Sequence, residues 1–429
     1  MRKIKYSLLL LFSLSFSQWL ETMIVVGKKP HRVCYNSLNH KVYCSNYFSH
    51  NISVIDASTN EVIDSIPARY RPITLCYNPI NNKVYCVICR SPSGGKADRI
   101  LVIDGETNQI ITTIQKGDGA DALLHNPINN KIYSADGRSN CVTIICGEGD
   151  TVIATIPTGR WPNGLCHNLR NNKIYCSNYL SNDITVIDGE GDSVLKTIQV
   201  GSGPWYMTYN SRNNKIYVGN WNEITVSVID GETDSVIATI DVGGRYPEGL
   251  CYNFRNNKVY CSHDGGVAVI DGETNRLITN IPVGWAPSLA IYNHINNKIY
   301  CADIGLDIII IIDGQTDRVI TTIPVGKFPY SFALNPIENR VYVGHSYWKE
   351  GTPPESSEST IAVIRDVIGI KELPFSLFSD SKIYPTIPKK VEGKIYDITG
   401  KLIIKEKIKP GIYFLKKDKK NFLKVIIKP

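Results

Sequence analysis

The residues that could carry out catalysis are dispersed along this chain. Its eight histidines are scattered, and the sequence contains no nucleophile motif, no HExxH motif and no phosphate-binding loop. Only His125, His263 and Asp264 stand out, as isolated candidates for a catalytic group. We therefore predict that the chain is not an enzyme and has no catalytic residues.

Metal and cofactor chemistry has little support either. Cys86-Val-Ile-Cys89 is formally a CxxC motif, but Arg90 follows it instead of a histidine, and no second CxxC completes a zinc site. A recurring aspartate could suggest calcium, yet the Gly-Glu-Thr that usually follows is typical of a hairpin turn capped by the carboxylate. These aspartates are Asp56, Asp104, Asp188, Asp230, Asp271 and Asp313. We predict no metal and no cofactor.

The elements that would position any site are copies of one unit. The phrase Asn-Pro-Ile-Asn-Asn-Lys-Val-Tyr-Cys at 78–86 occurs eight times in close variants, 40–48 residues apart. Each unit has four short runs rich in Val, Ile, Tyr and Thr, separated by Asn, Gly, Asp and Pro, without a helical period. The pattern predicts an all-β fold in which every unit is a four-stranded propeller blade.

The strand count predicts how the ring closes. Met23–Gly27 matches the fourth strand of other units, such as 281–284, and the last unit ends after three strands near Ile364. Eight blades would result if the N-terminal strand completed the last blade, which would also remove a free sheet edge. A seven-bladed ring with a detached unit is the alternative.

The repeats resemble a known family. Asn-Asn-Lys-Ile-Tyr-Val-Gly-Asn at 213–220 and Val-Ile-Asp-Gly-Glu-Thr at 228–233 are similar to the YVTN-type β-propeller repeat, over roughly residues 23–366. The resemblance implies a propeller of the kind found in surface-layer and other exported prokaryotic proteins. It implies no particular activity, because a shared fold does not carry a shared function.

Both ends of the chain predict export. Residues 1–17 have a positive start, an apolar run and small residues before Gln18, which is typical of a signal peptide. The propeller at 18–366 is followed by a linker at 367–380 and a small β-domain at 381–429. Its Tyr-Asp-Ile-Thr-Gly and Pro-Gly-Ile-Tyr-Phe phrases resemble the C-terminal sorting domain of type IX secretion substrates, a β-sandwich. This resemblance implies the export machinery as a partner and an extracellular or cell-surface location.

Composition excludes several classes of protein. With 43% hydrophobic and 9% aromatic residues, the 429-residue chain is not disordered. No apolar run after the N-terminus approaches the roughly 20 residues of a membrane helix, so we expect no integral membrane segment. The net charge of +7 arises in the tail, where 15 lysines oppose 6 acidic residues after residue 370; 32 basic and 34 acidic residues precede it. A nucleic-acid partner therefore has no electrostatic support.

Four cysteine pairs recur with a spacing of ten residues. If the two members of a pair face each other directly on neighbouring strands, their Cβ atoms are close enough for a disulfide. The alternative is a pair of buried reduced thiols, and a register shifted by one residue would place the sulfurs on opposite faces of the sheet. We favour disulfides because the protein is expected to be exported. The pairs are Cys34/Cys44, Cys76/Cys86, Cys166/Cys176 and Cys251/Cys261.

The two ends of the predicted ring differ. The turns that join strands one to two and three to four are nearly identical in all units and share one end. The other connections vary, contain insertions at 87–99 and 345–359, and share the opposite end, which we call the variable-loop face. Variable loops on a rigid scaffold usually carry recognition, and aromatic side chains beside arginine are typical of binding hot spots. The candidate binding residues are Tyr70, Arg71, Trp161, Trp205, Trp221, Tyr246, Trp285, Phe328 and Trp348.

The sequence thus predicts an exported binding scaffold that recognises a glycan or a surface protein through its variable-loop face. The aromatic residues could instead fill gaps between blades. An enzyme is the alternative function, because some propellers that resemble this one are lactonases or lyases with a site at the mouth of the central channel. That alternative predicts buried side chains with shifted pKa values at the channel mouth.

Overall fold

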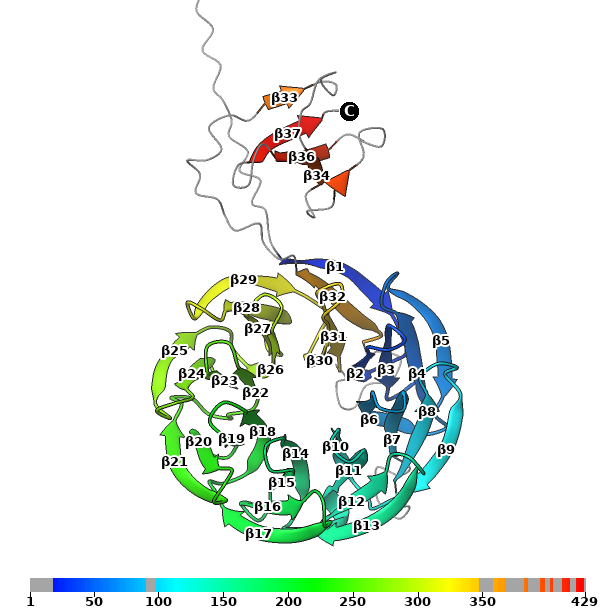
Figure 1. Cartoon of the computed structure of the whole chain (residues 1–429), viewed down its shortest axis with the longest axis vertical. Helices are drawn as coiled ribbons and strands as arrows, with labels where there is room; N and C mark the ends of the chain where they lie inside the picture. Colours follow the sequence, from blue (N-terminus) through cyan, green and yellow to red (C-terminus); the bar gives the residue numbers. More distant parts are fainter. Residues whose placement is uncertain are drawn as a thin grey trace, which may run out of the picture. The chain divides into compact units, whose positions relative to one another are not determined.

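The computed structural model describes residues 18–89, 98–346 and 358–366, and five short strands after residue 381. Eight antiparallel sheets of four strands stand around a central axis like blades (Figure 1). The fold is an eight-bladed β-propeller, as predicted, and the seven-bladed alternative is wrong. The only helix among the described residues is the short 3₁₀ turn η1 (Gly137–Ser139), and none of them belongs to a helix that could cross a membrane.

Every blade runs from an inner strand at the axis to an outer strand at the rim, and blades are numbered by their inner strands. The inner strands are β2 (Pro30–Asn36), β6 (Arg71–Asn78), β10 (Ala120–Asn126), β14 (Pro162–Asn168), β18 (Pro204–Asn210), β22 (Leu250–Asn253), β26 (Pro287–Asn293) and β30 (Pro329–Asn335). The second strands are β3 (Lys41–Asn46), β7 (Lys83–Cys89), β11 (Lys131–Asp136), β15 (Lys173–Asn178), β19 (Lys215–Asn220), β23 (Lys258–His263), β27 (Lys298–Asp303) and β31 (Arg340–His345). The third strands are β4 (Asn51–Asp56), β8 (Arg99–Asp104), β12 (Cys141–Cys146), β16 (Asp183–Asp188), β20 (Thr225–Asp230), β24 (Gly266–Asp271), β28 (Ile308–Asp313) and β32 (Thr360–Asp366). The outer strands are β5 (Glu61–Pro67), β9 (Ile110–Gln115), β13 (Thr151–Pro157), β17 (Ser193–Gln199), β21 (Ser235–Asp241), β25 (Leu277–Pro282), β29 (Arg318–Pro324) and β1 (Gln18–Val25).

The hairpins follow from the residues at their turns. Asn214 and Asp234 adopt positive φ angles of 54° and 51°, a left-handed conformation that Asn and Asp tolerate better than most residues. The Asp230 carboxylate accepts hydrogen bonds from the backbone N–H groups of Glu232 and Thr233, at 3.0 and 2.9 Å. The equivalent aspartates of five other blades cap their turns in the same way. The recurring aspartates are turn caps, as predicted.

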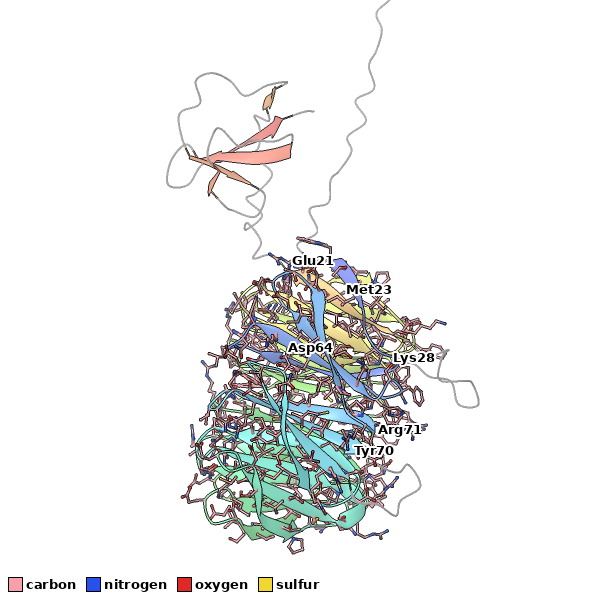
Figure 2. The ribbon with its side chains drawn as sticks, turned by 90° about the vertical axis from the view of Figure 1, so that its right-hand side faces the viewer. Glu21, Met23, Lys28, Asp64, Tyr70 and Arg71 are labelled. Carbon is pink, nitrogen blue, oxygen red and sulfur yellow. The ribbon has the colours of Figure 1, made fainter. Side chains whose placement is uncertain are left out.

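The N-terminal strand closes the ring. Strand β1 pairs with β32 in antiparallel register, from Gln18 opposite Asp366 to Val25 opposite Thr360, and so completes the eighth blade. The closure is as predicted, although the strand begins five residues earlier than the Met23 expected from the repeat. Figure 2 labels Glu21 and Met23 on this strand. The Arg340 guanidinium donates two hydrogen bonds of 2.7 Å to the Glu21 carboxylate. Side chains as well as backbone therefore hold β1 in place.

A buried tyrosine on the second strand fastens each blade to the next. The Tyr217 hydroxyl lies 3.4 Å from the carbonyl oxygen of Gly272 and 2.9 Å from Oδ1 of Asn275, both in the turn between strands three and four of the following blade. Nζ of Lys215 donates to the same turn, at 3.0 Å to the Gly272 carbonyl. We call this arrangement the tyrosine latch. The latch tyrosines, all fully buried, are Tyr43, Tyr85, Tyr133, Tyr175, Tyr217, Tyr260, Tyr300 and Tyr342.

The register of the hairpins excludes the predicted disulfides. Cys34 faces Tyr43, and Cys44 faces Val33, so the two cysteines are offset by one residue and point to opposite faces of the sheet. The other three pairs have the same offset. All twelve cysteines are free thiols. The disulfide prediction for Cys34/Cys44, Cys76/Cys86, Cys166/Cys176 and Cys251/Cys261 was therefore wrong, and burial raises the pKa of these thiols, which keeps them protonated and unreactive.

The chain divides after Asp366 into the ring and a second unit. The second unit contains a five-stranded sheet in the order β33-β37-β36-β34-β35. Its strands are β33 (Lys382–Tyr384), β34 (Lys394–Asp397), β35 (Leu402–Ile403), β36 (Gly411–Lys416) and β37 (Phe422–Ile427). The predicted signal peptide at 1–17 and the linker at 367–380 lie outside the described residues, as does Trp348.

The latch predicts a measurable contribution to stability. We expect Tyr217→Phe to lower the free energy of unfolding by about 1–2 kcal/mol, because the two acceptors in the next blade lose a buried donor. Chemical denaturation of the variant and the native protein measures the difference. Tyr246→Phe, which changes a tyrosine that is 43% exposed, is the matched control and should leave the stability unchanged. Equal stabilities for Tyr217→Phe and the native chain would contradict the role given to the latch.

Candidate functional site

The inner strands differ from one another at one position near their start. The residue there follows a proline in every blade except the third, and it varies between basic, acidic, uncharged polar, aromatic and aliphatic types. A β-bulge lies at or beside the position in seven blades, as between Pro329 and Ser331, and bulges redirect side chains. This position directly follows the blade-to-blade loops and lies on the strands nearest the axis. We therefore call the ring of eight such positions the channel mouth of the variable-loop face. The residues are His31, Ile73, Asp121, Asn163, Trp205, Glu248, Ser288 and Tyr330.

Arg32 reaches across the channel mouth. Its Nη2 donates a hydrogen bond of 3.2 Å to the Tyr206 hydroxyl on β18, and its Nη1 donates one of 3.2 Å to the backbone carbonyl of Tyr330 on β30. Strands β2 and β18 belong to blades one and five, which stand on opposite sides of the ring (Figure 1). The guanidinium carbon also lies 4.7 Å from the centre of the Tyr330 ring, within cation–π distance. One side chain thus connects blades one, five and eight.

The Arg32 guanidinium has no ion-pair partner among the carboxylates of the described residues. Burial opposes its charge, but Tyr206, Tyr330 and Asp121 together raise the pKa of Arg32. Charged groups that proteins bury usually have a partner of opposite charge. A confined guanidinium held only by neutral oxygens is therefore a candidate for binding an anionic group from outside the protein.

Two carboxyl groups stand near Arg32 without touching it. Burial raises the pKa of Glu248 to about 7, although the positive charge of Arg32 opposes the rise. Burial also raises the pKa of Asp121, against the positive charges of Arg32 and Lys116, although part of this residue is exposed to water. Glu248 can consequently gain or lose a proton near neutral pH, which is the property required of a general acid or base.

Aromatic rings continue from the channel mouth over blades five and six. The ring centres of Tyr206 and Trp205 are 6.4 Å apart, those of Trp205 and Trp221 are 6.0 Å apart, and those of Trp221 and Tyr246 are 4.7 Å apart. Tyr179 packs edge-on against Trp205 at 5.1 Å. Each separation is in the range of favourable ring–ring contact.

The rings also continue from Arg32 in the other direction. The Phe328 ring centre lies 6.0 Å from that of Tyr330, which in turn lies under the Arg32 guanidinium. A connected line of side chains therefore crosses the variable-loop face, with a single cation near its middle. We call it the aromatic strip, and its members in order are Phe328, Tyr330, Arg32, Tyr206, Trp205, Trp221 and Tyr246.

A branch leads from the strip to blades one and two. The His31 ring lies 6.2 Å from both Tyr330 and Tyr47, and the guanidinium of Arg71 lies 5.1 Å from the centre of the Tyr47 ring. Burial, followed by the charge of Arg32, lowers the pKa of His31 to about 3, so the imidazole is neutral. Figure 2 shows Lys28, Tyr70 and Arg71 toward one end of the ring, where this branch lies.

Both ends of the strip carry backbone strain. Tyr246 and Phe328 have φ angles of 58° and 56°, at a position where blades three and five have Gly119 and Gly203. A left-handed conformation costs a residue with a side chain about 1–2 kcal/mol compared with its usual conformation. Hydrogen bonding offsets the cost at Phe328, whose N–H donates to Oδ1 of Asp307 at 2.8 Å. The same conformation occurs directly before the inner-strand proline at Lys29 and Trp161, so it belongs to the repeat and does not by itself distinguish the strip.

The sequence-predicted candidates divide into two groups. Trp205, Trp221, Tyr246 and Phe328 lie in the strip, and Arg71 lies in its branch. Of the other candidates, Tyr70, Trp161 and Trp285 lie apart from the strip, and Trp348 is outside the described residues. Tyr70 packs against the core between blades one and two, which is the gap-filling role given as the alternative.

Trp161, Trp285 and the catalytic candidate His263 do not belong to this site. Trp161 has a φ of 60°, and its N–H donates to Asn140 Oδ1 at 2.9 Å. Trp285 is 69% exposed and contacts no other ring among the described residues. His263 is buried, and its two ring nitrogens lie 3.0 Å from the Asp264 carbonyl and 2.8 Å from Asn280 Oδ1, which gives it a structural role.

Sequence reasoning missed Arg32, Tyr206, Glu248 and Tyr330. Each is a single departure in one repeat, and none is near another in the chain. The signal that could have found them is the alignment of the eight repeats at the residues after the proline, where the types differ while the flanking positions recur. No group of three or more potential metal ligands occurs within the described ranges.

The comparisons with known proteins assign no family to the chain. It matches no protein-family model, and no curated protein is similar to it. The structure shows the class of protein, an eight-bladed propeller built from repeats. The YVTN-type repeat and the sorting domain remain expectations that rest on the sequence phrases.

The raised pKa of Glu248 predicts a pH-dependent change in stability. A carboxyl titrates near 4.5 when unperturbed, so the folded ring loses stability as the pH rises from about 4.5 through 7, where the unfolded chain releases the proton first. We expect Glu248→Gln to stabilise the protein at pH 8 by about 1–3 kcal/mol and to have little effect at pH 4. Thermal or chemical unfolding at both pH values measures this. Glu232→Gln, at an exposed turn, is the control, and the same small effect for both variants at both pH values would contradict the burial of Glu248.

Proposed function

We propose that the protein is exported and binds an extended glycan through the aromatic strip of its variable-loop face. The observation that carries the proposal is the unbroken line of contacts from Phe328 through Arg32 to Tyr246. Isolated aromatic residues on a surface need no explanation, but a connected line of rings across one face provides a surface for a ligand.

The shape of the strip favours a glycan chain over a compact ligand. Sugar rings have apolar faces that stack on Trp and Tyr, and the rings of the strip succeed one another across several blades. A ligand that lies along them would contact blades eight, one, five and six in turn. Strands hold the rings of Tyr330, Tyr206 and Trp205, while the other three rings lie in loops. The central part of the strip is therefore rigid before binding, which limits the conformational entropy lost there.

The opposite end of the ring is occupied by structural contacts. Its turns accept hydrogen bonds from the latch tyrosines and lysines of neighbouring blades, as the Gly272 turn does from Tyr217 and Lys215. The variable-loop face has a recurring contact as well, in which a backbone N–H before an inner strand donates to an Asn or Asp side chain of the preceding blade. The side chains at its channel mouth differ from blade to blade, however, and this variation supports recognition on the face that bears the strip.

Export and a cell-surface location are part of the proposal. The support is the order of charged, apolar and small residues at 1–17 and the sorting-domain phrases at 381–429. In this proposal the second unit interacts with the export machinery, while the ring binds the ligand.

Catalysis at the channel mouth is the second candidate function. Glu248, with a pKa raised to about 7 beside the positive charge of Arg32, is the observation that favours it. An acid–base reaction on a bound sugar chain or lactone would use this group, and Glu248→Gln would abolish turnover. Binding without turnover of the ligand by the native protein would exclude it.

The strip predicts which tryptophans matter for binding. In a glycan screen followed by titration of the bound oligosaccharide, we expect Trp205→Ala or Trp221→Ala to weaken binding by about 1–2 kcal/mol, because each removes a stacking ring. Trp285→Ala is the matched control, since this exposed tryptophan lies outside the strip. Absence of glycan binding by the native protein, or equal losses for all three variants, would contradict the proposal.

A further inference from the structure

We propose that Arg32 is the binding site for the carboxylate of an acidic sugar, so that the glycan bound along the strip is a uronic-acid-containing chain. The inference rests on the proposed function, because it names the class of glycan that the same strip would bind. It is carried by the position of Arg32, by its lack of an ion-pair partner among the described residues and by the hydrogen bonds that fix it.

The position of Arg32 makes it the charge that a ligand on the strip would meet. Tyr330 lies on one side, with its ring centre 4.7 Å from the guanidinium carbon, and the Tyr206 hydroxyl lies 3.2 Å away on the other. No other cation belongs to the line of contacts. A chain of sugars stacked on the rings of both sides would therefore pass over this guanidinium.

The chemistry of Arg32 suits a carboxylate. A guanidinium presents five N–H donors in a planar fork, which matches the two oxygens of a carboxylate. The hydrogen bonds to Tyr206 and to the Tyr330 carbonyl fix the plane of the fork before any ligand arrives. No carboxylate of the described residues forms an ion pair with it, so a ligand carboxylate would not have to displace one.

The nearby acidic groups make the site sensitive to pH. Arg32 from β2 lowers the pKa of Glu248 against the effect of burial, and Glu248 in turn raises the pKa values of Tyr330 from β30 and Cys301 from β27. Asp121 lies near Arg32 as well, with Lys116, Asp98 and Arg138 around it. Below pH 7 Glu248 is mainly protonated and leaves Arg32 free to attract an anion. Above pH 7 its negative charge offsets that attraction, so binding of an acidic sugar weakens.

The test compares two ligands that differ only in charge. Trigalacturonate and its fully methyl-esterified form have the same rings and the same length, and only the first carries carboxylates. We expect the full-length native chain to bind trigalacturonate on the order of tenfold more tightly than the ester at pH 6, as measured by calorimetry. The preference should shrink at pH 8 in the native protein and persist there in Glu248→Gln.

The protein variants test the residue. Arg32→Lys keeps the charge but loses the fork, and we expect it to remove most of the preference for trigalacturonate. Arg170→Lys, in an exposed turn at the opposite end of the ring, is the matched control and should bind as the native protein does. The ligand comparison uses the native chain, so the result does not depend on how well the Arg32 variant folds.

The outcomes separate this inference from the proposed function. Equal binding of both sugars overturns the carboxylate site and leaves glycan binding by the strip intact. Binding of neither sugar, together with binding of a short peptide through its free C-terminal carboxylate at Arg32, overturns the acidic sugar and the glycan proposal together. If the protein binds neither sugar and no peptide, the acidic-sugar site and the glycan proposal are also both overturned. A preference for trigalacturonate that survives Arg32→Lys overturns the assignment to this residue.

Discussion

The structure depends on one repeated requirement: the buried hydroxyl of each latch tyrosine must find its acceptors in the next blade. Tyr217 meets this need at Gly272 and Asn275, and most other latch tyrosines do so at equivalent turns, whereas Tyr300 donates to the Asp366 carboxylate at the end of β32. A tyrosine at the end of an open array would have no such partner, so the contacts favour a closed ring. They also explain why the turns at that end hardly vary from blade to blade.

Ring closure is what brings the candidate site together. Arg32 comes from the first blade and Tyr330 from the eighth, whose sheet is complete only when β1 pairs with β32. Tyr206 comes from the opposite side of the ring. Residues separated by 174 and 298 positions in the chain meet because eight blades return the last one to the first. The tyrosine latches and the candidate binding site therefore occupy different ends of the same blades but rely on the same closure.

The sequence predicted the fold well because the same pattern of strands and turns recurs in eight repeats. Strand number, closure and turn caps all follow from spacing and turn residues such as Asp230. Register could not be predicted as well: the pairing of Asn36 with Lys41 makes Cys34 face Tyr43 and not Cys44, and this depends on the turn geometry. The channel mouth was missed because Arg32, Tyr206 and Glu248 are single departures in distant repeats, and only the ring brings them close.

The most direct test of the account is a crystal structure of the protein with a bound acidic oligosaccharide such as tetragalacturonate. We expect density for the sugar chain along the rings from Phe328 to Tyr246, with one carboxylate in bidentate contact with the Arg32 guanidinium. Sugar bound elsewhere on the ring, or lying on the strip with its carboxylates turned away from Arg32, would contradict it.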